Sequence, residues 1–249
     1  DVKSDYGNAL LRALITPRVA KGQFFAPMHW TRQRTTRATI NAVVDPVTDP
    51  ISAQPASKTA AVTARVYKAK WYGFLACIAE PTPQAPYTAV ARTPTGWQVE
   101  LAGKHTIEDW EAQARSLSGQ TGGDVSMQTD PATGALRIAI TENGVITALL
   151  FTSPTPVVVS RSAIINLIGT NTLAILALAG RSPSGQLDAG VTVCACFNVG
   201  RNTLLAAVAN GAHTVAALGD TTCAGTNCGS CNPEQPALLA LAQLHVAAE

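Results

Sequence analysis

The six cysteines of this 249-residue chain are distributed very unevenly. Five of them lie in the last 56 residues, and only Cys77 lies elsewhere. A small secreted domain that depends on disulfides spreads its cysteines over the whole chain. Clustering at one end of a chain of ordinary size indicates instead a metal or cluster site in a reducing compartment, so we expect a cytoplasmic protein.

Two close pairs of cysteines provide the candidate ligands, Cys194 with Cys196 and Cys228 with Cys231. The 31 residues between the pairs are 197–227. Four thiolates suit Zn²⁺ or an iron–sulfur cluster. Zinc ligands usually come in pairs separated by about two to four residues, whereas only one residue separates Cys194 from Cys196. A [2Fe–2S] cluster has two irons, so each cysteine pair can bind a separate iron. The pattern favours [2Fe–2S], with zinc and unrelated thiols as the alternatives.

Cys223 fits the ligand set less well, because it lies only five residues before Cys228. We expect Cys223 to be a small buried side chain, and we expect neither Cys223 nor Cys77 to bind metal. Gly225, Gly229 and Ser230 would let backbone N–H groups approach the sulfur atoms of a cluster, which tunes its potential.

The composition excludes several classes of protein. Charged residues form 14% of the chain and hydrophobic residues 47%, with a mean hydropathy of +0.15, so the chain is not of the disordered type. A net charge of +2 without long charged runs gives no basic patch for nucleic acid. The longest apolar stretch, 163–179, is interrupted by Asn, Gly and Thr residues, so we expect no membrane span.

Patterns along the chain predict most of the secondary structure. Residues 31–58 are predicted to form a long loop, and a proline-rich linker is expected at 80–94. Strands are expected at 62–78 and 97–101, and a hairpin at 136–141 and 145–152 around Asn143-Gly144, since Asn-Gly is a strong hairpin signal. Helices are expected at 107–117, 162–167, 173–179, 202–209 and 215–218, and a last one after Pro233.

Three helix ends carry specific signals. Thr106 with Asp109 resembles a capping box that would begin the helix at 107–117, and Gly119 would end it. Thr214 is predicted to cap the helix at 215–218, and Gly219 to end it.

The cysteine segment resembles a known family. The motif Val-Cys-Ala-Cys-Phe-Asn-Val-Gly at 193–200, Asn-Gly-Ala at 210–212 and Cys-Gly-Ser-Cys-Asn-Pro-Glu at 228–234 are similar to the [2Fe–2S] domain of the bacterioferritin-associated ferredoxin type. That domain occurs at the C-terminal end of bacterial assimilatory nitrate reductases and within nitrite reductases. The resemblance implies that Cys194, Cys196, Cys228 and Cys231 are the four cluster ligands.

The N-terminal segment resembles the cofactor-binding domain of molybdopterin oxidoreductases, and the assimilatory nitrate reductase version most closely. Residues 22–30, Asn41, the Asp-Pro-Ile-Ser motif at 49–52, Pro55 and Lys58 carry this similarity. It implies that Asn41 and Lys58 hydrogen-bond the pterin system. It also implies that Met28 lies near the substrate funnel, although relatives have an aromatic residue there.

Together the resemblances imply a multidomain, β-rich architecture. Residues 1–68 would be the C-terminal part of a double-psi β-barrel that binds molybdopterin dinucleotide. Residues 69–188 would be an α+β middle unit, and residues 189–249 a small all-α iron–sulfur domain. The cofactors implied are molybdenum-bis-molybdopterin guanine dinucleotide and [2Fe–2S].

The chain lacks other motifs of that family, namely the Cys-rich [4Fe–4S] motif and the molybdenum-ligating cysteine. It begins with neither a methionine nor a signal peptide. We therefore expect the C-terminal third of a catalytic subunit that reduces nitrate to nitrite and that is inactive without its N-terminal remainder. The expected electron donor is an NAD(P)H-dependent reductase subunit, a ferredoxin or a flavodoxin. The alternatives are a separate electron-transfer or iron-handling module, another molybdopterin oxidoreductase, and a structural zinc protein.

Overall fold

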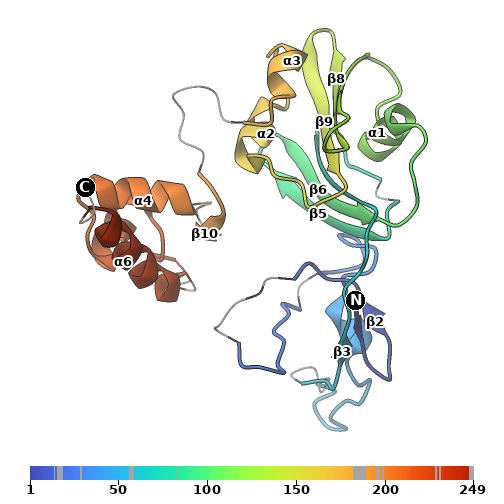
Figure 1. Ribbon diagram of the computed structural model, residues 1–249. Helices are drawn as coiled ribbons and strands as arrows, with labels where there is room; N and C mark the ends of the chain where they lie inside the picture. Colours follow the sequence, from blue (N-terminus) through green and yellow to red (C-terminus); the bar gives the residue numbers. More distant parts are fainter. Residues whose placement is uncertain are drawn as a thin grey trace. The chain divides into compact units, whose positions relative to one another are not determined.

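Residues between Trp71 and Ser153 form a six-stranded antiparallel sheet in the order β5-β6-β4-β9-β8-β7 (Figure 1). The computed structural model describes residues 1–13, 15, 19–28, 30–55, 59–82, 84–181, 189–194, 197, 199–227, 229 and 231–246. The strands are β4 Trp71–Cys77, β5 Tyr87–Thr93, β6 Gly96–Gly103, β7 Asp124–Asp130, β8 Ala135–Glu142 and β9 Val145–Ser153. Antiparallel neighbours need only short connections, which explains the simple path of the chain.

The sheet belongs to the first of two units into which the chain divides. The first unit comprises Asp1–Val158 and Ile165–Ala179, and the second comprises Val159–Ile164 and Gly180–Glu249. The expected three-domain division, with boundaries after residues 68 and 188, stays a prediction.

Helices cover both faces of the sheet. Leu75 and Leu150 lie in one apolar cluster with Leu117 of α1 (Trp110–Ser118). Their neighbours Phe74 and Phe151 are paired across β4 and β9, and alternation along a strand directs these two rings to the opposite face. Figure 1 shows α3 (Ala174–Ala177) on the side of the sheet away from α1. Helix α2 (Arg161–Leu167) spans the boundary between the two units. Burial on both sides explains why the central strands are apolar almost throughout.

The predicted hairpin between β8 and β9 is confirmed. Asn143 and Gly144 connect the strands with φ of 52° and 77°, and Glu142 pairs with Val145. Two consecutive residues with positive φ form the tight turn that matches the twist of the two strands.

The predicted capping box at the start of α1 is wrong. Asp109, rather than Thr106, caps the helix, and its carboxylate accepts a hydrogen bond of 2.9 Å from the Ala112 N–H. The helix therefore begins at Trp110 instead of Ile107. Its end is as predicted, because Gly119 adopts the left-handed conformation with φ of 68°.

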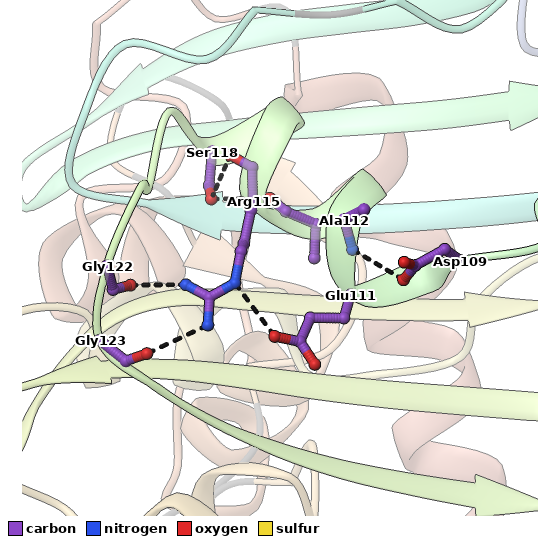
Figure 2. A network of polar contacts seen from close by, with 8 residues as sticks. Asp109, Glu111, Ala112, Arg115, Ser118, Gly122 and Gly123 are labelled. Atoms are coloured by element: carbon purple, nitrogen blue, oxygen red, sulfur yellow. Dashed lines mark hydrogen bonds and ion pairs between the residues drawn. The ribbon is translucent and has the colours of Figure 1, made fainter.

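Arg115 connects α1 to the chain that leads into β7 (Figure 2). Its guanidinium donates to the Glu111 carboxylate at 3.1 Å and to the carbonyls of Gly122 and Gly123 at 2.6 and 3.1 Å. One planar side chain thus satisfies three acceptors and fixes the connection between the helix and the outermost strand.

The linker predicted at 80–94 is also wrong, because β5 occupies its second half. Residues 87–93 are rich in β-branched side chains and contain no proline, because Pro86 and Pro94 only flank them. The segment can therefore pair with β6 at the edge of the sheet. The loop at residues 31–58 covers the outer edge of β5. Val90 donates its N–H to the Arg34 carbonyl at 2.8 Å, and the Thr35 hydroxyl donates to the Thr88 carbonyl at 2.6 Å.

The N-terminal part of the first unit has little regular structure. Three strands of two residues each, β1 Val2–Lys3, β2 Asn8–Ala9 and β3 Thr63–Ala64, form a sheet in the order β2-β1-β3. The loop predicted at 31–58 contains one turn of 3-10 helix, η1 Ile40–Val43, within its described residues. The described residues agree with a β-rich chain but do not confirm a double-psi barrel.

The second unit is mainly helical. Its elements are β10 Thr192–Cys194, β11 Val199–Gly200, α4 Arg201–Ala209, α5 Val215–Thr222, η2 Asn232–Glu234 and α6 Gln235–Val246. The all-α prediction omitted the two-stranded β10-β11 ribbon. Thr214 caps α5 as predicted, but α5 continues through Gly219 to Thr222. Across the described part of the chain, no helix has the length and apolar character needed to cross a membrane.

Replacing Asp109 by Ala should lower the free energy of unfolding of the first unit by about 1 kcal/mol, because the Ala112 N–H loses its acceptor. All four tryptophans (Trp30, Trp71, Trp97 and Trp110) lie in that unit, so denaturant unfolding followed by their fluorescence measures its stability. Glu108→Ala is the control, since Glu108 is an exposed neighbour outside the helix. Equal stability of the two variants would contradict the assignment of the cap.

Candidate metal centre

The second unit brings two of the four predicted ligands together. Cys194 is the last residue of β10, and Cys231 lies immediately before η2. Both are buried, with 2% and 3% of their surface exposed, and their thiols are hydrogen-bonded to each other. Cys196 and Cys228 lie outside the described residues, so the four-cysteine set stays a prediction.

A small apolar core holds this pair of thiols in place. Leu204 of α4, Leu218 of α5 and Leu238 of α6 pack in the same buried cluster as the two cysteines. The other members are mostly Ala and Val, so the core contains few large side chains. The cysteines therefore form part of the core that joins the helices.

The chain between α5 and η2 is tightly turned. Cys223, Gly225 and Gly229 have φ of 62°, 82° and 70°, all in the left-handed region. A Cβ atom added to Gly225 would collide with the Asn232 side-chain oxygen. Gly225 therefore permits both the backbone conformation and the close approach of η2.

Gln235 is a contact of the cysteine pair that the sequence analysis missed. Its side chain is fully buried. The Nε2 atom donates to the Cys231 sulfur at 3.7 Å and to the Asn232 Oδ1 at 3.3 Å. The signal that could have identified it is its spacing, because Gln235 follows Cys231 by four residues at a predicted helix start.

The neighbours of Cys231 shift the pKa of its thiol in opposite directions. Burial and the hydrogen bond with Cys194 raise the pKa of the Cys231 thiol, whereas the Gln235 amide lowers it. A cysteine must be a thiolate to bind a metal ion. The Gln235 amide is thus the neighbour that favours the ligand form of this sulfur.

The two remaining cysteines differ from each other. Burial raises the pKa of the Cys77 thiol to about 12, and Cys77 lies within the sheet core, so it stays a neutral thiol near pH 7. Cys223 is exposed and ends α5 in the left-handed conformation, which corrects the prediction that it is buried. Among the four cysteines that the structure describes, no disulfide is formed.

The Asp-Pro-Ile-Ser motif of the N-terminal segment forms a turn. The Asp49 carboxylate accepts from the N–H groups of Ser52 and Ile51 at 2.7 and 3.0 Å and from the Ser52 hydroxyl at 2.9 Å. The hydrogen bonds from Ser52, together with that from Ile51, lower the pKa of Asp49. The motif thus fixes the local backbone.

The other predicted residues of this segment have separate environments. Asn41 lies in η1 with an exposed side chain. Met28 is 40% exposed and lies in a loop with the exposed aromatic residues Phe24 and Phe25. Lys58 lies outside the described residues. The roles of Asn41, Lys58 and Met28 stay predictions.

Two segments of the chain match known families. Residues 1–61 match the family described as "Molydopterin dinucleotide binding domain". Residues 192–240 match the family described as "BFD-like [2Fe-2S] binding domain". The chain therefore combines a segment for binding molybdopterin dinucleotide with a [2Fe–2S]-binding segment. Both resemblances found in the sequence are confirmed.

Two curated relatives are similar over short regions. A nitrate reductase of Klebsiella oxytoca is 46% identical over 63 residues, which is 25% of this chain and 7% of the relative. The nitrite reductase (NADH) large subunit of Escherichia coli (strain K12) is 45% identical over 65 residues, or 23% of this chain and 8% of the relative. The match spans less than a tenth of either relative. No solved structure matches the chain.

The residues present fit a group that is held by sulfur. Two thiols, one from β10 and one from the residue before η2, meet in an apolar environment, and a buried amide donor faces one of them. Thiolate is the ligand that iron–sulfur clusters require. An amide N–H directed at a ligand sulfur is a typical contact around such clusters.

Replacing Gly225 by Ala should destabilise the second unit by about 0.5–1.5 kcal/mol more than replacing Gly211 by Ala, because only the new methyl group at 225 displaces the Asn232 side chain from its hydrogen bond with Gln235. Gly211 also has a positive φ, of 103°, but nothing lies within 4 Å of a Cβ atom there. Hydrogen exchange of the α4 and α5 amides measures the difference. Equal losses would show that backbone strain alone requires Gly225.

Proposed function

We propose that the chain is the C-terminal part of a molybdenum-dependent assimilatory nitrate reductase. The intact enzyme would reduce nitrate with two electrons and two protons to nitrite and water. In this part, residues 1–68 would bind one side of a bis-molybdopterin guanine dinucleotide, and residues 189–249 would pass electrons through a [2Fe–2S] cluster.

The observation that supports this most strongly is the presence of both matched segments in one chain. An isolated ferredoxin needs no molybdopterin-binding segment. A molybdopterin enzyme that receives electrons from a separate protein does need an electron-accepting centre. The similarity to a nitrate reductase favours nitrate as the substrate.

The residues of the second unit have a simple role in this proposal. Cys194, Cys196, Cys228 and Cys231 hold the cluster, which supplies one-electron transfer when it is bound. The apolar residues around Cys194 and Cys231 exclude water from that side of the site. Exclusion of water strengthens the polar contacts made to the ligand sulfurs.

The N-terminal residues orient the molybdenum cofactor. The exposed Asn41 amide can both donate to and accept from the edge of a pterin ring. Lys58 adds a positive charge, which suits a cofactor rich in phosphate. The Asp49 turn fixes the backbone of residues 49–52, which lie between Asn41 and Lys58 in the sequence. Met28 would lie near the path of the substrate.

The proposal includes two partners, an N-terminal remainder of the subunit and a separate electron donor. An N-terminal remainder would supply the [4Fe–4S] cluster and the molybdenum ligand, so this segment alone would not reduce nitrate. A reductase subunit that uses NAD(P)H, a ferredoxin or a flavodoxin would deliver electrons in the cytoplasm. No partnership with nucleic acid or membranes is proposed.

A nitrite reductase is the second candidate, and the similarity to the Escherichia coli large subunit favours it. The two candidates differ in the need for molybdenum. The segment that matches the molybdopterin-binding family favours the nitrate reductase.

The test uses the longer subunit that contains this chain. Cys194→Ser should remove the cluster and stop nitrate reduction with the physiological protein donor, because electrons no longer enter through the second unit. Small reduced dyes that reach the molybdenum side directly should still support turnover, and the molybdenum content should be unchanged. Nitrate reduction with each donor and the metal content are the measurements.

Cys223→Ser is the matched control, because Cys223 is exposed and is not a predicted ligand. It should keep its iron and its activity with both donors. Equal loss of dye-supported and protein-supported activity in the Cys194 variant would contradict the proposed electron path. Loss of iron in the Cys223 variant would mean that the ligand set is wrong.

A further inference from the structure

Gln235 is the one fully buried amide side chain of the second unit among the residues that the structure describes. Its Nε2 atom carries two N–H groups and has two acceptors, the Cys231 sulfur at 3.7 Å and the Asn232 Oδ1 at 3.3 Å. Its Oε1 accepts no hydrogen bond from any described residue. Burial of an amide oxygen without a hydrogen-bond partner is unfavourable. A glutamine at this position therefore indicates a role other than stabilising the fold.

The orientation of this amide is set by its neighbours. Asn232 presents its side-chain oxygen to Gln235, and Cys231, once it is a thiolate, can only accept hydrogen bonds. Rotation of the Gln235 amide by half a turn would place Oε1 against these two acceptors. The donor side of Gln235 therefore faces the sulfur.

The position of Gln235 in the fold maintains this contact. It is the first residue of α6, directly after the single turn of η2 that begins at Asn232. Cys231 and Leu238, on either side of it, both lie in the buried cluster of the unit. Neither the backbone nor the surrounding side chains leave the amide free to turn toward water.

We propose that Gln235 is a positioning residue that sets the reduction potential of the cluster through its N–H to Cys231. This inference rests on the proposed [2Fe–2S] centre. Reduction brings one electron into the cluster and makes its sulfur ligands more negative. A fixed N–H donor stabilises the more negative state more strongly, and the effect is larger in a buried site. Gln235 thus raises the potential and helps the cluster to accept an electron.

The experiment uses the full 249-residue chain loaded with iron and sulfide, with dithionite as the one-electron reductant in a spectroelectrochemical titration. Gln235→Met keeps the length of the side chain and removes the N–H donor. The variant should bind the cluster and favour its reduced state about tenfold less, a potential lower by about 59 mV. Gln128→Met, the same change at an exposed site on β7, should leave the potential unchanged.

A second measurement needs no substitution. In the wild-type chain made with glutamine labelled by ¹⁵N at the side chain, pulsed electron paramagnetic resonance of the reduced cluster should detect coupling to that nitrogen. The coupling arises because some of the unpaired spin of the cluster extends onto an N–H group that is hydrogen-bonded to a ligand sulfur. This measurement decides the matter if Gln235→Met fails to hold the cluster.

The possible outcomes separate the two proposals. A wild-type chain that binds zinc and no cluster overturns the proposed electron-transfer role, and this inference with it. A wild-type cluster with no nitrogen coupling, or a Gln235→Met cluster with an unchanged potential, overturns only the role of Gln235. Coupling together with a lowered potential supports both.

Discussion

The contact between the Cys194 and Cys231 thiols organises the second unit. The two residues come from its first strand and from the start of its last helical segment, and they meet inside a core made largely of Ala and Val. Side chains of this size bury little apolar surface, and units this small are seldom stable without a further link. Metal binding at such a site supplies folding free energy as well as function, so we expect the cluster and the helices to stabilise each other.

The sheet of the first unit has a different basis for its stability. Its central strands are buried on both faces, and large side chains such as Phe74, Phe151 and Leu150 fill its core. Arg34 and Thr35 attach the N-terminal loop to the outer strand β5. The loop that carries Asn41 and the Asp49 turn is therefore anchored on a rigid sheet, as a cofactor-binding segment requires.

Features governed by local chemistry could be predicted from the sequence. Asn143-Gly144 identifies its hairpin because few other residues adopt two successive positive φ angles, and Thr214 identifies the start of α5 because a hydroxyl satisfies a free N–H there. The secondary structure was predicted wrongly where tertiary contacts determine it. Prolines around 80–94 predicted a linker, but pairing with β6 and the cover from Arg34 and Thr35 make 87–93 a strand.

In the candidate site, too, the sequence predicts the local pattern but not the features that depend on tertiary contacts. Cysteine spacing was enough to predict that Cys194 and Cys231 belong to one site, because two close pairs of cysteines are typical of a shared metal centre. Gln235 was not recognised, since its four-residue spacing from Cys231 is a weak signal and a glutamine at a helix start is ordinarily solvated. Its importance depends on its burial and on the orientation of its amide. Cys223 was expected to be buried because of its residue type, and its exposed left-handed position follows from the end of α5.

The central claim is that the second unit holds a [2Fe–2S] cluster, and metal analysis of the chain tests it most directly. The chain is purified without oxygen, and its iron, zinc and acid-labile sulfide are measured together with its visible absorption. We expect two irons and two sulfides per chain, the composition of this cluster, and a reddish-brown colour. One zinc ion per chain with no iron and no sulfide would contradict it.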